Sequence, residues 1–234
     1  IPAILCFLFA FSMQIDANFI NDYYDYLKGS DREDRLGPER ACAQGWITLP
    51  AMKKGMIITT LLSCFWGLLL LRYCGVEMIP VGLLCVLFAF LYTAGPYPLA
   101  YHGWGDVLAI VFFGFVPVGC TYYTMAHDWT WNVTIGCAAC GLVSDLLLML
   151  NNYRDREQDK ISGKRTIIVR FGEKAGRYAY LWLGIIAVGL CSYYAFHGHP
   201  LASILPLLFL ILHFTTWREM VRIHQGKRLN IVLG

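Results

Sequence analysis

The sequence predicts an all-α protein, a helical bundle embedded in a membrane. Hydrophobic residues make up 57% of the 234 residues and charged residues 15%, whereas an ordinary soluble domain has about 25% charged residues. Seven apolar stretches are long enough to cross about 30 Å of hydrocarbon as helices. They lie near residues 1–24, 55–74, 78–96, 105–125, 132–152, 177–197 and 199–217.

The chain begins inside an apolar run at Ile1 and stops at Gly234, shortly after a basic loop. We therefore expect residues 1–234 to form a single membrane-embedded domain that is incomplete at both ends. The nine cysteines are scattered, mostly in apolar runs, where Cys behaves as a small hydrophobic residue. Cys137 and Cys140 form a CxxC pattern inside a predicted span without a second ligand pair nearby, which disfavours a metal or redox role.

The basic residues predict how the chain is oriented in the membrane. If the seven spans alternate in direction, 18 of the 19 Lys and Arg residues lie on one side, and only Arg72 lies on the other. The positive-inside rule makes that side cytoplasmic, which favours a bacterial cytoplasmic (inner) membrane. The net charge of +3 is small, so a nucleic-acid partner is not expected. The first loop is predicted to carry Lys28, Arg32, Arg35, Arg40, Lys53 and Lys54.

A polar stripe closes the first span at its predicted cytoplasmic end. At 100° per residue, Asn18, Asn21, Asp22 and Asp25 fall within about a 100° arc of one helix face. Further charged residues follow in the adjoining loop, namely Lys28, Asp31, Asp34, Arg35 and Arg40.

A second stripe of the same design closes the fifth span. Asn151, Asn152, Asp155 and Asp159 again share one face if the helix continues, and Lys160 and Gly163-Lys164-Arg165-Thr166 follow. Asn21 and Asn151 are 130 residues apart, as are Asp25 and Asp155. This repetition suggests two halves of a bundle that face each other.

Carboxylates at membrane depth are costly, so repeated clusters that face a bundle interior indicate function. Magnesium takes oxygen ligands and is commonly held by one or two carboxylates together with substrate phosphates. Lys and Arg would neutralise the remaining phosphate oxygens. The alternative is that these Asn and Asp residues cap helices in solvated loops, but their occurrence at two matching span ends favours a Mg²⁺–diphosphate site.

The two stripes resemble the motifs of the UbiA superfamily of intramembrane aromatic prenyltransferases. That superfamily has an NDxxD-type motif and a DxxxD motif followed by a G-K-x-T-like run, which here read Asn21-Asp22-Tyr-Tyr-Asp25, Asp155-Arg-Glu-Gln-Asp159 and Gly163–Thr166. The resemblance covers nearly the whole chain. It implies nine helices around a central cavity, of which the seven spans would be the second to the eighth.

Within the superfamily, two segments resemble the branch that prenylates 1,4-dihydroxy-2-naphthoate in menaquinone synthesis. One runs from Asn21 to Gly45, and the other from Gly95-Pro96-Tyr97-Pro98 to Gly105. Gly29 stands where the hydroxybenzoate branch has a third aspartate, with Asp31 two residues later. The branch implies transfer of a polyprenyl group from its diphosphate to the naphthoate, with loss of diphosphate and CO₂, giving a demethylmenaquinol without a covalent enzyme nucleophile.

The resemblance also implies roles for individual residues. The catalytic aspartates would be Asp22, Asp25, Asp155 and Asp159, which with Asp31 would bind Mg²⁺. Substrate contacts would come from Asn21, Lys28, Arg35, Arg40, Asn152, Lys164, Arg165, Tyr92, Tyr97, Tyr101 and Asp145. The tyrosines could line the cavity and shield an allylic cation, or they could belong to an aromatic belt at the membrane surface. Asp16 lies on a different helix face from Asp25 and is expected to be a structural partner of another helix.

Other functions remain open at this point. A related branch would use another acceptor, such as homogentisate or 4-hydroxybenzoate, or a phytyl donor, with the same metal site. A transporter would also bury charge, but its sites usually lie near the bilayer midplane at broken helices, whereas here the acids gather at one mouth. A non-catalytic membrane scaffold would have no need for paired aspartate stripes.

Overall fold

The computed structural model describes residues 1–31 and 35–233, so Arg32 and Asp34 lie outside the described residues. The described residues form helices and connecting loops, with no strand among them. Within these ranges, seven helical segments are long and apolar enough to cross a membrane, which confirms the predicted fold class. They are Pro2–Leu27, Leu49–Cys74, Val76–Thr93, Gly105–Ala126, Trp131–Ile161, Ile167–His197 and Pro200–Ile223.

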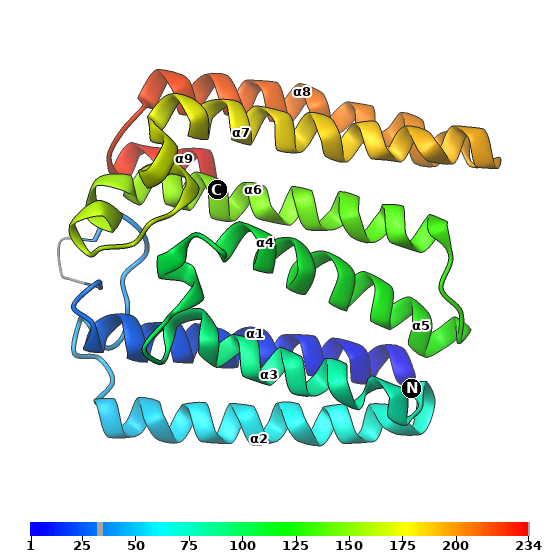
Figure 1. Ribbon diagram of the computed structural model, residues 1–234, viewed down its shortest axis with the longest axis horizontal. Helices are drawn as coiled ribbons and strands as arrows, with labels where there is room; N and C mark the ends of the chain where they lie inside the picture. Colours follow the sequence, from blue (N-terminus) through cyan, green and yellow to red (C-terminus); the bar gives the residue numbers. More distant parts are fainter. Residues whose placement is uncertain (32–34, 234) are drawn as a thin grey trace. The chain divides into compact units, whose positions relative to one another are not determined.

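The chain divides into two compact units, which are described separately. The first comprises Ile1–His102 and Cys120–Asp128, and the second comprises Gly103–Gly119 and the chain from Trp129 onward. Figure 1 shows the helices in sequence colours. The first unit contains α1 (Pro2–Leu27), α2 (Leu49–Cys74), η1 (Val76–Met78), α3 (Ile79–Thr93), η2 (Leu99–His102) and α5 (Thr121–Ala126). The second contains α4 (Gly105–Ile110), the π-helical η3 (Val111–Cys120), α6 (Trp131–Ile161), α7 (Ile167–Cys191), η4 (Ser192–His197), α8 (Pro200–Ile223), η5 (Lys227–Leu229) and α9 (Asn230–Leu233).

Two helices begin earlier than their hydropathy predicts. The helix α2 starts at Leu49, so Lys53 and Lys54 belong to its first turns and not to the preceding loop. The helix α7 starts at Ile167, ten residues before the predicted start of its span. Hydropathy marks the part of a helix that suits hydrocarbon, whereas local backbone chemistry sets where the helix begins. The Thr166 side chain caps α7 by accepting the N–H of Val169 at 3.3 Å.

In the first unit, α1 packs against α2 and α3. A buried cluster of Ile20, Cys42, Met52 and Met56 lies beside the end of α1 that carries the first polar stripe. Because Cys42 belongs to the loop between α1 and α2, this cluster fixes that loop against both helices.

Asp16 links α1 to α2 inside the first unit. Its fully buried carboxylate accepts hydrogen bonds from Thr59 Oγ1 at 2.6 Å and Thr60 Oγ1 at 2.8 Å. This contact confirms that Asp16 is a structural partner of another helix. A buried charge of this kind needs such donors because no water is available inside the bundle.

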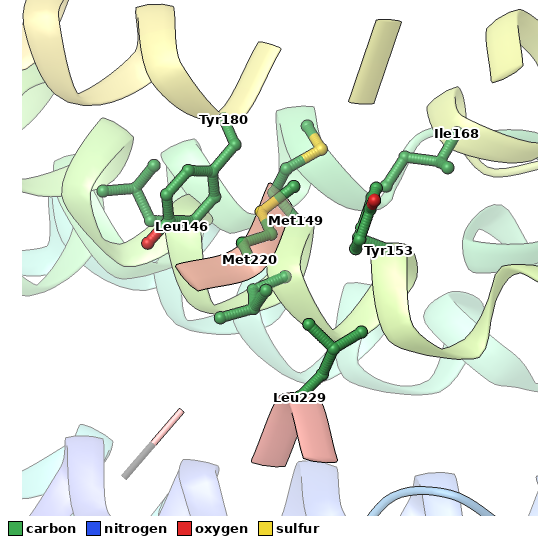
Figure 2. Packing of buried hydrophobic residues seen from close by; sticks show 8 residues of the cluster. Leu146, Met149, Tyr153, Ile168, Tyr180, Met220 and Leu229 are labelled. Atoms are coloured by element: carbon green, nitrogen blue, oxygen red, sulfur yellow. The ribbon is translucent and has the colours of Figure 1, made fainter. Parts of the chain in front are cut away.

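In the second unit, the core lies where α6, α7 and α8 meet. Leu146, Met149, Leu150 and Tyr153 of α6 pack with residues of the other segments, namely Ile168, Tyr180, Met220 and Leu229 (Figure 2). Most of the α6 residues in this cluster immediately precede the second polar stripe. The core therefore holds the stripe on a rigid helix.

We expect Asp16→Ala to lower the free energy of unfolding by about 1 to 3 kcal/mol, because two interhelical hydrogen bonds are lost. Thermal unfolding of the purified protein in detergent measures the effect. Asn18→Ala is the matched control, since Asn18 is exposed and bonds only to the Gln14 carbonyl of its own helix. Equal unfolding temperatures for the two variants would contradict a stabilising role of the hydrogen bonds between Asp16 and α2.

Candidate active site

The first polar stripe is part of a hydrogen-bonded network that joins three elements. Tyr101 of η2 donates its hydroxyl proton to the buried Asp25 carboxylate at 2.7 Å. Thr93 of α3 donates to the Asn21 side-chain oxygen at 3.0 Å. The Lys28 ammonium donates to the Thr93 carbonyl and lies 4.8 Å from the centre of the Tyr101 ring. Asn21, Asp25, Lys28 and Tyr101, all predicted site residues, are thus brought together.

Asp22 holds the backbone of the following loop. Its two carboxylate oxygens accept the N–H groups of Ala41 at 3.0 Å and Cys42 at 3.2 Å. Burial, together with the nearby Asp22 charge and a hydrogen bond to it, raises the pKa of the Cys42 thiol to about 11. Asp22 therefore orders the loop that carries the first set of arginines.

Asp31 lies between two of those arginines. The Arg35 guanidinium donates to one of its oxygens, and Arg40 Nε lies 3.6 Å from the other. The Asp31 side chain is buried, while both arginine side chains are partly exposed. The carboxylate thus fixes two cationic groups that keep access to their surroundings.

The three predicted cavity tyrosines differ in their surroundings. Tyr101 is buried, Tyr92 is half-buried on α3, and Tyr97 is 56% exposed. Tyr97 stacks on His102, with ring centres 3.5 Å apart. The Tyr101 hydroxyl bonds to a motif aspartate.

The second polar stripe lies on α6, which continues through Ile161 and so keeps Asn152, Asp155 and Asp159 on one face. Both oxygens of Asp155 accept hydrogen bonds of 2.7 Å from Arg154. Arg154 is almost fully buried and also donates to Asn230 at 2.9 Å. Such a two-pronged contact holds a carboxylate in one orientation.

The basic run follows directly after α6. Gly163 adopts φ +79°, a left-handed conformation that glycine accepts, and the Lys164 N–H donates to the Asp159 carbonyl at 2.8 Å. This turn keeps Lys164 and Arg165 next to the end of the stripe. Asp145 is buried on the same helix, nearer its start.

A charged cluster around Glu173 was not predicted from the sequence. Tyr153 donates to Glu173 at 2.7 Å, Arg177 Nε donates to the Tyr153 oxygen at 2.9 Å, and Arg156 lies 3.7 Å from Glu173. These contacts join the end of α6 to the start of α7. Nothing in the sequence indicates them, because they depend on how the two helices pack.

Comparison with protein families places these motifs in a known group. Residues 2–231 match the model of the UbiA prenyltransferase family. The chain belongs to this family. The resemblance seen in the two aspartate motifs is thereby confirmed, and the family assignment covers all seven spans.

Three curated relatives of this family member share the name 1,4-dihydroxy-2-naphthoate octaprenyltransferase. The Escherichia coli protein is 38% identical over 84% of this chain and 67% of its own length. The Haemophilus influenzae protein is 36% identical over 82% of this chain and 64% of its own length. The Mycobacterium tuberculosis protein is 34% identical over 80% of this chain and 63% of its own length. The chain thus spans about two thirds of the length of these relatives.

A solved structure shares the fold. It is described as digeranylgeranylglyceryl phosphate synthase in membranes, and it matches 99% of this chain and 79% of its own with a TM-score of 0.60. The sequence identity is 20%, so the likeness concerns the fold alone.

The Asp22 contact predicts how Cys42 reacts in a protein that keeps Cys42 as its sole cysteine. With a pKa of about 11, maleimide labelling should rise about tenfold per pH unit up to about pH 11, because the thiolate is the nucleophile. Asp22→Ala should speed labelling at pH 8 about tenfold or more, since it removes the charge and releases the loop. Asp22→Asn should have a smaller effect.

The control for this measurement is Thr48→Cys in a protein without Cys42. Thr48 is exposed and belongs to the same loop. The labelling rate of the introduced cysteine should not respond to Asp22→Ala. A Cys42 rate that is the same with and without Asp22 would rule out the proposed anchoring of the loop.

Proposed function

We propose that this chain is the membrane-embedded part of an enzyme of menaquinone synthesis. It transfers a polyprenyl group from an allylic polyprenyl diphosphate to 1,4-dihydroxy-2-naphthoate, with release of diphosphate and CO₂, to give a demethylmenaquinol. One observation carries this proposal: four relatives at 33 to 38% identity, each matched over at least 80% of this chain, are named for this transfer.

Magnesium dependence belongs to the proposal. The first stripe, through Asp25 and Asn21, and the second stripe, through Asn152, Asp155 and Asp159, each offer the oxygen ligands that Mg²⁺ prefers. Among the described residues, no group of three His, Cys, Asp or Glu side chains could hold a metal alone. In this proposal, one or two carboxylates of a stripe therefore bind the ion together with oxygens of the substrate diphosphate. When bound, Mg²⁺ would stabilise negative charge on the leaving diphosphate.

In this proposal Asp22 and Asp31, both predicted as metal ligands from the sequence, have supporting roles instead. The Asp22 oxygens accept two backbone N–H groups, and Asp31 pairs with Arg35 and Arg40. Both aspartates act on the loop, where they hold the arginines that would meet phosphate oxygens. We therefore place the metal ligands of the first stripe at Asp25 and Asn21.

The remaining chain groups bind and shield the reactants. Arg35, Arg40, Lys164 and Arg165 would neutralise the diphosphate, so that its departure leaves an allylic cation. An electron-rich ring carbon of the naphthoate attacks this cation. The Tyr101 ring, held by its hydrogen bond to Asp25, offers a π-face that stabilises positive charge nearby.

We also propose that both stripes face the cytoplasm in a bacterial inner membrane. The sequence supports this orientation because 18 of the 19 Lys and Arg residues fall on the side of the membrane where both stripes are predicted to lie. A cytoplasmic mouth would admit the water-soluble naphthoate, while the prenyl chain enters from the lipid.

The test is an assay of membranes that contain the full-length protein. They are incubated with 1,4-dihydroxy-2-naphthoate, a polyprenyl diphosphate and Mg²⁺, with or without a chelator. The wild type should form a prenylated product that the chelator abolishes. Asp25→Ala and Asp155→Ala should each lower the rate by at least about 100-fold, because transition-state charge loses its support.

Glu157→Ala is the matched control, since Glu157 lies between Asp155 and Asp159 on α6 with a side chain that is 72% exposed. It should keep nearly full activity. Product formed only with homogentisate or 4-hydroxybenzoate would overturn the proposed acceptor. Activity that survives the chelator would overturn the metal requirement.

A further inference from the structure

Two buried aspartates of the second unit have no role in the metal site. Asp106 lies in the first turn of α4 and is 5% exposed, and Asp145 lies midway along α6 and is 1% exposed. In each, Oδ1 has no hydrogen-bond partner among the described residues. Neither forms an ion pair with a basic side chain in the described part of the chain, although isolated charge at such a depth is costly.

The packing of α4 and η3 on α6 places these two side chains within electrostatic reach of each other. A Cβ on Gly141 would lie 2.6 Å from the Ile110 carbonyl oxygen, and one on Gly114 would collide with the Cys137 carbonyl. The segments therefore run antiparallel and in close contact. One further turn along each helix places Asp106 opposite Asp145, and each lies within the electric field of the other.

The pair is also aligned with the second motif. Asp145 precedes Asn152 by seven residues and Asn152 precedes Asp159 by seven, so the three lie on one face of α6 at steps of about 10 Å. Gly103, just before α4, packs against the backbone of Arg165, because a Cβ there would lie 2.8 Å from the Arg165 carbonyl oxygen. Both helices of the pair are thus tied to the second motif.

We propose that Asp106 and Asp145 hold one proton between them and act as the base and acid for the aromatic acceptor, an inference that rests on the prenyl transfer proposed above. Two carboxyl groups that share a buried site do not both ionise, as the general behaviour of carboxyl dyads shows. Such a dyad accepts one proton and gives it back.

The proton follows a closed cycle. The dyad takes the proton of the ring hydroxyl next to the carbon that bears the carboxylate, and both of its members are then protonated. The ring carbon bonds to the allylic carbon, whose C–O electron pair leaves with the diphosphate. The bond to CO₂ then breaks, its electrons restore the aromatic ring, and the ring oxygen recovers the proton from the dyad.

Infrared spectroscopy of the purified full-length protein tests the shared proton without any substrate. The wild type at pH 7 should show a carbonyl band of a protonated carboxylic acid that shifts in D₂O. Asp106→Asn and Asp145→Asn should each shift that band, because the remaining carboxyl group stays neutral in its buried site but no longer shares its proton with a second carboxylate. The double Asn variant should remove the band. A band that keeps its position in both single variants, or that persists in the double variant, would overturn the proposal.

Kinetics test the catalytic role. Each Asn variant should lower kcat by about 100-fold at unchanged KM for the polyprenyl diphosphate, the loss expected for an acid–base group. Asp145→Leu should do the same while keeping the unfolding temperature, because an apolar side chain suits this contact. Ser144→Ala, on a different face of α6, is the control and should keep wild-type kcat.

If Asp106 and Asp145 only stabilise the fold, their variants should have a lower unfolding temperature and a kcat within about threefold of wild type. That result would overturn the proposal. If the wild type prenylates a different ring, the proposed acceptor fails. The same variants on that ring, and the infrared band, then still decide the dyad.

Discussion

A carboxylate inside a helical bundle must be compensated without bulk water, and this requirement links sequence to structure throughout the chain. Asp16 receives two threonine hydroxyls, Asp25 receives the Tyr101 hydroxyl, and Asp155 is held by Arg154. In each unit the cost of an unpaired charge exceeds that of ordering a polar partner. The acids therefore determine which helices and loops pack together.

The same requirement separates the aspartates of the first motif by task. Both oxygens of Asp22 accept hydrogen bonds from N–H groups of the loop, and Asp31 pairs with two guanidinium groups. Asp25, one helical turn from Asp22, receives the Tyr101 hydroxyl. Aspartates that look alike in sequence thus make different contacts: Asp22 orders the loop, Asp31 holds two arginines and Asp25 meets a tyrosine.

Periodicity and length sufficed to predict the seven spans and the shared helix faces of both stripes, because these depend on residues close in sequence. Partners distant in sequence were beyond such reasoning. The anchoring of Asp22 depends on a loop about 20 residues away, and Glu173 meets Arg156 only because α6 and α7 pack. Asp106 was missed, although an acid at the start of an otherwise apolar span is a signal that could have drawn attention to it.

The approach of the helix that carries Asp106 to the helix that carries Asp145 depends on small residues. Gly114 and Gly141 let the backbones of η3 and α6 touch, and the π-helical turns around Pro117 change how side chains are spaced along this span. With the helices this close, each of the two carboxyl groups lies within the electric field of the other, and neither Oδ1 has a hydrogen-bond partner in the described part of the chain. The smallest cation that can compensate two opposed carboxylates at such a contact is a proton, and a shared proton is one that a bound hydroxyl can exchange.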